Sequence, residues 1–147
     1  MHNALKNINV ESFLPMIQSI NQWSDRKKKI LKPLFPSYVF VKVNSSSDFG
    51  KALSVNGACS YISFGREYAT ISGSEINNIK KLVTTDKITD FEVENQIKKG
   101  DFKIINQGPL EGLECQVVKI NNQNKVVVSI DSLKQNILAT VPLHFVE

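Results

Sequence analysis

Three aromatic side chains stand close together in PLFPSYVFVKV, the proline-rich segment of residues 33–43. Aromatic rings at a protein interface can each contribute about 2 kcal/mol or more, so this group could bind a partner. Because successive side chains of a strand point to opposite faces, the second half of the segment separates into a valine face and an aromatic face. Burial of the strand on both faces is the alternative. The candidate binding residues are Phe35, Tyr38 and Phe40; Lys42 continues their face, and Val39, Val41 and Val43 form the face that suits a core.

A run of positive charge precedes this segment. It consists of Arg26, Lys27, Lys28 and Lys29, with Lys32 close behind. Like charges at this spacing repel one another, so a partner that carries phosphates is one reason to hold them together. A solvated charged surface is the alternative. The four consecutive residues are therefore candidates for nucleic-acid binding, which would depend strongly on salt.

Groups that could catalyse a reaction or hold a metal are scattered. The sequence shows no nucleophile–base pair, metal-ligand cluster or phosphate-binding loop. His2 and His144 lie near opposite ends of the chain. Cys59 and Cys115 are far apart without a CxxC motif, which favours two buried free thiols over one disulfide. We expect no enzymatic activity, no cofactor and no metal site.

The composition is typical of a soluble globular protein, with 41% hydrophobic and 22% charged residues in a chain of 147. No apolar run approaches the roughly 18 residues that span a bilayer, and the start lacks a signal-peptide core. We therefore expect a cytoplasmic protein without membrane contact. The net charge of +4 is uneven: residues 1–85 hold 11 Lys/Arg against 5 Asp/Glu, and residues 86–97 hold 1 against 4. This asymmetry fits an N-terminal half that lies near nucleic acid.

Alternating and amphipathic patterns predict a small α+β sandwich for residues 1–85. Two extended arms form a long hairpin with the basic run at its tip, and Pro15 indicates an edge or a bulge in the first arm. The serine-rich residues 45–48 predict a helix start. The expected elements are a helix end at residues 2–8, arms at 11–23 and 27–43 around a turn at 24–26, a helix at 48–56, strands at 58–64 and 68–71, and a helix from residue 72 with Ile76, Ile79, Leu82 and Val83 on one face.

Short strands separated by turn signals predict a second domain, a small SH3-like β-barrel over residues 98–147. The polar and acidic residues 86–97 are predicted to be a linker between the two domains. The strands are expected at residues 102–105, 115–120, 125–130 and 137–141, with a last short strand near Phe145.

Three segments carry a resemblance to a known family, which extends over nearly the whole chain. PLFPSYVFVKV resembles the signature of the N-terminal domain of NusG-type transcription factors. QWSDRKKKI, at residues 22–30, is most similar to their specialised UpxY-like branch. GDFKIINQGPLEGLECQVVKI, at residues 100–120, resembles a KOW motif. The chain has Ser37 where the signature often has glycine, and Cys115 where the second KOW strand usually has glycine.

The resemblance implies a binding role for the aromatic group. In the family, the residues that match Phe35, Tyr38 and Phe40 line a hydrophobic concavity that grips the clamp helices of RNA polymerase. The hairpin tip would lie near upstream DNA, and the KOW domain would dock a ribosomal protein or the termination factor Rho. We expect a monomeric, operon-specific transcription antiterminator of the exopolysaccharide type. A general NusG elongation factor and an RNA- or ribosome-binding KOW protein are the alternatives.

The beginning of the chain departs from the family pattern. NusG-type N-terminal domains start with a Trp-Tyr strand and a full helix, whereas the residues after Met1 resemble only the end of that helix. We therefore expect a truncated or misannotated start, with the missing strand encoded upstream.

Overall fold

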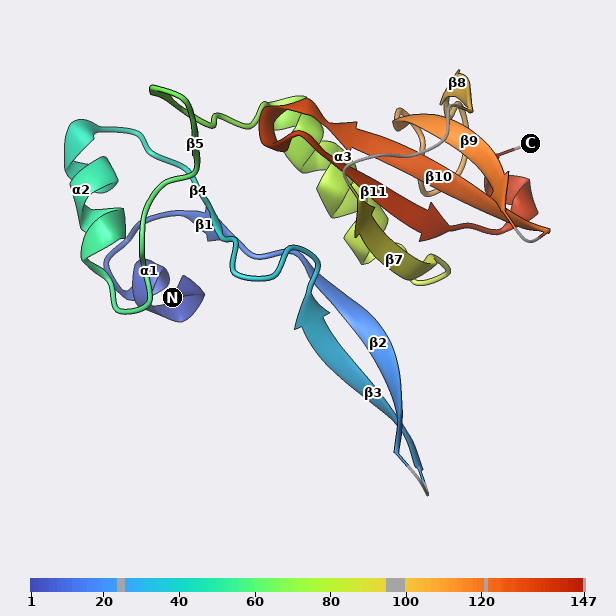
Figure 1. Cartoon of the computed structure of the whole chain (residues 1–147), viewed down its shortest axis with the longest axis horizontal. Coiled ribbons are helices and arrows are strands. Elements are labelled where there is room, and N and C mark those ends of the chain that lie inside the picture. The colour runs from blue at the N-terminus through green and yellow to red at the C-terminus, as the bar shows by residue number, and fades with distance from the viewer. Residues whose placement is uncertain (24–25, 95–99, 121, 147) are drawn as a thin grey trace. The chain divides into compact units, whose positions relative to one another are not determined.

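A computed structural model describes residues 1–23, 26–94, 100–120 and 122–146 (Figure 1). The chain divides into two compact units. The first comprises Met1–Leu14 and Phe35–Ala69, and the second comprises Pro15–Leu34 and Thr70–Glu147.

The first unit combines two helices with two short antiparallel ladders. Strand β1 (Ser12–Phe13) pairs with β4 (Phe40–Val41), and β5 (Ser63–Phe64) pairs with β6 (Glu67–Tyr68). The helices are α1 (His2–Asn7) and α2 (Ser46–Ser54). Leu5, Val10 and Ala52 form the buried core, and several partly buried apolar side chains pack against it. The strands are shorter than the sequence predicts, because the pairing at each ladder extends over only two residues.

Helix α2 begins where the serine-rich cluster predicts it. Ser45 is the N-cap residue, and its side-chain oxygen accepts a hydrogen bond from the Asp48 backbone N–H at 3.2 Å. Such a cap stabilises a helix by about 1 kcal/mol, since it satisfies a backbone donor that lacks a partner within the helix. The predicted helix start is therefore confirmed.

The second unit contains the predicted basic hairpin. Strand β2 (Met16–Trp23) pairs with β3 (Arg26–Pro33) through eight consecutive positions, from Met16 opposite Pro33 to Trp23 opposite Arg26. The predicted turn includes residues 24–25, which lie outside the described residues. The second arm ends at Pro33 and does not continue to residue 43 as the sequence predicts. Because proline has no backbone N–H, it marks the boundaries of this ribbon at Pro15 and Pro33.

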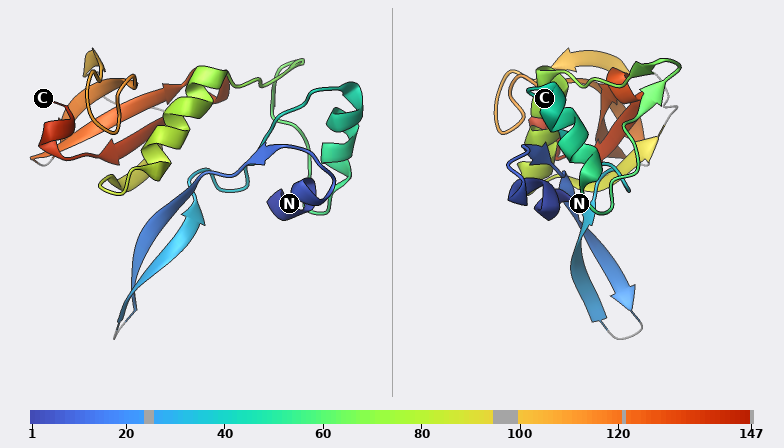
Figure 2. Two further views of the ribbon diagram at one scale, coloured as in Figure 1. Left: turned by 180° about the vertical axis from the view of Figure 1, so that it is seen from behind. Right: turned by 90° about the vertical axis from the view of Figure 1, so that its left-hand side faces the viewer.

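The C-terminal strands of this unit form a five-stranded antiparallel sheet in the order β7-β11-β10-β9-β8 (Figures 1 and 2). Its buried side chains include Val126, Val128 and Ile137, none of which is more than 1% exposed. The mixture of helices with this sheet agrees with the predicted α+β class. The strands are β7 (Thr89–Glu94), β8 (Asp101–Ile104), β9 (Glu114–Ile120), β10 (Gln123–Ile130) and β11 (Gln135–Thr140), with 3-10 turns at Asp131–Leu133 and Leu143–Phe145.

Two segments of the C-terminal region have a secondary structure other than the one that the sequence predicts. β7 pairs with β11 in the segment predicted to be a linker, because its isolated apolar residues Phe91 and Val93 alternate along a strand. Residues 95–97 of that linker lie outside the described part. The strand predicted near Phe145 is a 3-10 turn. The backbone N–H groups of Phe145 and Val146 donate hydrogen bonds to the carbonyl oxygens of Pro142 and Leu143, respectively.

Helix α3 (Gly73–Thr84) lies beside this sheet in Figure 1 and in the left view of Figure 2. Its N-terminus carries a capping box, in which the side chains of Ser72 and Glu75 each accept a hydrogen bond from the backbone N–H of the other residue. The sequence places this helix in the N-terminal domain, but Glu75 accepts a hydrogen bond from the Ser132 hydroxyl at 2.7 Å and Lys81 donates to the Glu111 carbonyl. These contacts join α3 to the C-terminal strands. The domain boundaries at residues 85 and 98 stay a prediction.

Among the described residues, no helix is both long enough and apolar enough to cross a membrane.

Candidate functional site

The three predicted aromatic residues come together in one cluster in the first unit. The rings of Phe35 and Phe40 meet edge to face with centroids 5.8 Å apart, and the Phe35 and Tyr38 rings lie 6.4 Å apart. Edge-to-face and offset arrangements at these distances are favourable because of the ring quadrupoles. The structure therefore brings Phe35, Tyr38 and Phe40 together, and they are called the aromatic cluster from here on.

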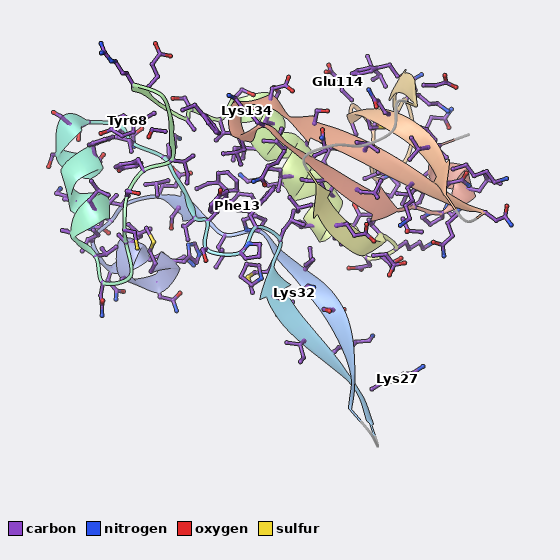
Figure 3. All side chains as sticks on the ribbon, in the orientation of Figure 1. Phe13, Lys27, Lys32, Tyr68, Glu114 and Lys134 are labelled. Carbon is purple, nitrogen blue, oxygen red and sulfur yellow. The ribbon has the colours of Figure 1, made fainter. Side chains whose placement is uncertain are left out.

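A fourth ring, which the sequence analysis missed, extends this cluster. Phe13 of β1 lies opposite Phe40 of β4, and the two ring centroids are 6.1 Å apart. Figure 3 labels Phe13 beside these strands. In the sequence, Phe13 is a single aromatic residue two positions before Pro15. Nothing in that local pattern indicates that it pairs with Phe40, which lies far along the chain.

Burial separates the members of the aromatic cluster into two kinds. Phe35 is only 1% exposed, whereas Tyr38 and Phe40 are half-buried. A side chain without exposed surface cannot contact a partner directly. Phe35 therefore supports the other two rings from within, and the accessible ring surface belongs to Tyr38 and Phe40.

A tight turn sets the positions of these rings. The Tyr38 backbone N–H donates to the Phe35 carbonyl oxygen at 3.2 Å, which closes a four-residue turn around Pro36 and Ser37. Ser37 has a φ of 67°, the left-handed conformation that a type II turn requires at its third position. Glycine adopts this conformation without a steric penalty, whereas the Cβ of Ser37 makes it unfavourable.

The turn also corrects the predicted strand of residues 38–43. Only Phe40 and Val41 pair as a strand, because the left-handed residue Ser37 interrupts the extended chain before them. Val39 and Val41 pack against the core, as predicted, but Val43 is 38% exposed. Lys42 forms an exposed ion pair with Glu11 at 3.4 Å, which contributes little to stability.

A second group of rings lies elsewhere in the first unit. Phe49 and Tyr61 stack at 4.2 Å, and Tyr68 meets both rings edge to face. The Tyr61 hydroxyl donates to the Phe49 carbonyl oxygen at 3.0 Å. Burial raises the pKa of Tyr61 above its usual value, and the neighbouring Tyr68 raises it further. This group fastens α2 to the segment that follows it.

The predicted nucleic-acid-binding residues all lie at the start of β3. Arg26 is opposite Trp23, and Lys27, Lys28 and Lys29 follow it along the strand. Lys27 and Lys29 are exposed. The side chains of Arg26 and Lys28 lie outside the described part of the structure. The hairpin thus presents positive charge to solvent at the end away from its proline boundaries.

A cleft of about 360 Å³ lies in the second unit between the first turn of α3 and the sheet. Glu75, Glu114 and Asp131 are among its lining residues, together with Ser72 and Phe102. Burial alone would raise the pKa of Glu75, but hydrogen bonds from Ser72 and Ser132 outweigh burial and lower it below its usual value. The described lining contains none of the predicted site residues, so this cleft is not part of the predicted site.

The cysteines and histidines do not form a reactive centre among the described residues. No group of three potential ligands there could hold a metal ion. Both cysteines are free; Cys115 is buried as predicted, but Cys59 is exposed, since the short strands of its unit leave the surrounding loop on the surface. Burial raises the pKa of Cys115 to about 11, although Lys103 opposes the shift. Cys115 pairs regularly with Lys103 in β8, without a bulge.

The helices and sheets define an α+β protein in which one unit carries the aromatic cluster and the other carries a basic hairpin. A family model described as transcription termination factor nusG matches residues 1–80, more than half of the chain. The chain therefore belongs to the NusG family of transcription factors. Proteins of this family generally bind RNA polymerase. No curated protein matches the chain in a sequence search.

Proposed function

We propose that this NusG-family protein is a transcription antiterminator or elongation factor that binds the clamp helices of RNA polymerase through its aromatic cluster. The observation that carries the proposal is the arrangement of Tyr38 and Phe40, which are half-buried over the fully buried Phe35. Their rings offer apolar area that is held rigidly by a turn and a strand pair, so little conformational entropy is lost on binding. This arrangement lies within the residues that match the family.

Retention of the protein on immobilised RNA polymerase tests this proposal. Tyr38→Ala should abolish most of the retention, because truncation of an aromatic anchor typically costs about 2 kcal/mol or more, a loss of roughly 30-fold in affinity. Phe35→Ala is unsuitable as a site variant, since emptying a buried phenylalanine position costs about 3–5 kcal/mol of stability.

Phe64→Ala is a matched control, since Phe64 is 39% exposed in the same unit but lies outside the aromatic cluster. It should leave retention unchanged. Unchanged retention of the Tyr38 variant, with its circular dichroism spectrum preserved, would count against the site.

The five-stranded sheet is proposed to act as a KOW domain that docks a ribosomal protein or Rho. The similarity of residues 22–30 to the UpxY-like branch supports an operon-specific role in exopolysaccharide transcription. Mapping the genomic sites where the protein co-purifies with polymerase tests this: a few long operons are expected, whereas occupancy of most genes would indicate a general elongation factor.

The protein is proposed to act by binding and not by catalysis, as a cytoplasmic monomer. The exposed lysines of the hairpin favour a second candidate function, in which the protein binds RNA or the ribosome without polymerase. RNA binding in the absence of polymerase that depends on Lys27 and Lys29 would support that alternative.

A further inference from the structure

One row of side chains across the C-terminal sheet changes from buried to exposed. Phe102 of β8 lies opposite Gln116 of β9, which lies opposite Val127 of β10. Val127 in turn lies opposite Leu138 of β11. Val127 and Leu138 are each 3% exposed, whereas Gln116 is half-buried and Phe102 is 72% exposed. Because directly opposed residues share a face, this face of the sheet is covered at β10 and β11 and uncovered at β8 and β9.

The uncovered part carries large apolar side chains on an edge strand. β8 is the last strand of the sheet (Figure 1). Ile104 lies two positions beyond Phe102 on the same face and is 54% exposed. Glu114 of β9 lies opposite Ile104 and is also exposed. Phe102, Ile104 and Glu114 are called the exposed strip, and grouped apolar surface of this kind is typical of an interaction site.

The cleft of about 360 Å³ lies at the border of the exposed strip. Its lining joins Phe102 and Glu114 of the strip to Glu75 and Asn78 of α3. A helix is about 10 Å across and paired strands lie about 4.8 Å apart, so one helix covers about two strands. The uncovered strands β8 and β9 are therefore about as wide as one further helix, which would lie alongside α3.

The charge around this cleft is negative. Three carboxylates line it, those of Glu75, Glu114 and Asp131, and its described lining contains no lysine or arginine. The two ion pairs found among the described residues involve none of the three carboxylates. The pKa of Glu75 lies below its usual value, so this carboxylate is charged at neutral pH. A complementary partner therefore combines apolar side chains with positive charge.

The described helices of a second copy do not offer such a surface. Helix α1 has six residues with a single basic side chain, Lys6, and α2 pairs Lys51 with the opposite charge of Asp48. The apolar side chains Ile79 and Leu82 of α3 are fully buried within their own unit. The complementary helix therefore belongs to a different protein.

We propose that the groove between α3 and β8 binds a basic amphipathic helix of a partner protein. The apolar stripe of that helix packs on Phe102 and Ile104. Its lysine or arginine side chains lie toward Glu75, Glu114 and Asp131. The inference rests on the proposed docking role of the five-stranded sheet, since it states which surface docks and what kind of segment it takes.

Fluorescence anisotropy of the full-length protein with two labelled peptides tests the inference. Both peptides have about 16 residues, long enough for a helix to form, and the same leucine, alanine and lysine content. The leucines recur at helical spacing in one peptide and at every second position in the other. The helical-period peptide should bind more tightly, and Phe102→Ala should weaken its binding by about 10-fold. Glu114→Gln should weaken it at low salt and reduce its dependence on salt.

Two matched control variants change the same kinds of side chain elsewhere in the second unit. Leu143→Ala removes an apolar side chain that is 55% exposed and outside the described lining of the cleft. Asp101→Asn removes an exposed carboxylate from the other face of β8. Both variants should bind the helical-period peptide as wild type does.

Equal or tighter binding of the alternating peptide would overturn the inference, because it would indicate strand addition at the edge of β8. Unchanged affinity in a folded Phe102→Ala variant would exclude the exposed strip. Equal binding of a peptide with glutamate in place of lysine would exclude the role of the carboxylates. Polymerase retention separates these results from the proposed function: it depends on Tyr38 and should be the same for wild type and Phe102→Ala, whether or not the peptide binds.

Discussion

Replacing Ser37 with glycine should increase the free energy of unfolding. Ser37 is held at a φ of 67° by the turn that positions the aromatic cluster. A non-glycine residue in this left-handed region costs roughly 1–2 kcal/mol, because its Cβ approaches the following carbonyl oxygen. Glycine removes that penalty. Its greater conformational freedom in the unfolded chain, however, lowers the free energy of unfolding by about 0.5–1 kcal/mol. The expected net gain is about 0.5–1 kcal/mol.

Urea denaturation followed by far-UV circular dichroism measures this gain as an increase in the midpoint concentration. In a thermal melt the same change corresponds to an increase of about 2 °C for a chain of this length. Polymerase binding should be retained, because the backbone conformation that places Tyr38 is unchanged.

Two control variants separate backbone relief from other effects. Ser37→Ala keeps a Cβ in the left-handed region and should give no stabilisation. Ser47→Gly changes an exposed serine in the first turn of α2 and should lower stability by about 0.3–0.5 kcal/mol, since glycine is a poorer helix former than serine. A neutral or destabilising Ser37→Gly, or an equal gain from Ser37→Ala, would refute the type II turn.

Three further predictions concern the second unit and the thiols. The pKa of Glu75 is lowered by its hydrogen bonds, so its contribution to stability is present above the unfolded pKa of about 4.5 and is lost as pH falls through the lower folded pKa. The stability difference between wild type and Glu75→Gln should therefore shrink below about pH 4.5 in urea titrations, and a difference that is constant with pH would contradict this. Under native conditions near pH 8 one thiol, Cys59, should react rapidly with a disulfide reagent, while Cys115 should react only after unfolding; Cys59→Ser should remove the fast phase. A fragment of residues 70–147 should give a cooperative unfolding transition, whereas residues 98–147, which lack β7 and α3, should not; a folded shorter fragment would refute the role of these elements.

Elements specified by neighbouring residues could be predicted from the sequence. The N-caps Ser45 and Ser72 act within three residues of their partners, so the starts of α2 and α3 are apparent without any knowledge of the fold. The alternating pattern before and after the basic run likewise predicts the hairpin, because both strands and their turn are contiguous.

Elements specified by distant partners could not be predicted in the same way. β7 is a strand because β11 lies more than 40 positions further along the chain and offers an unpaired edge. The amphipathic pattern of α3 shows that Ile79 and Leu82 are buried, but not which sheet covers them. The site follows the same rule: the aromatic residues are apparent in the sequence, whereas the burial of Phe35 depends on how the turn and the β1–β4 pair fold around it.

We propose that the exposed part of the aromatic cluster, Tyr38 and Phe40, binds RNA polymerase. The most direct measurement is the affinity of wild type and Tyr38→Ala for the isolated clamp-helix region of polymerase, measured by calorimetry with Phe64→Ala as the control. We expect a loss of roughly 30-fold for Tyr38→Ala and no change for the control. Equal affinities of wild type and a folded Tyr38→Ala variant would contradict it.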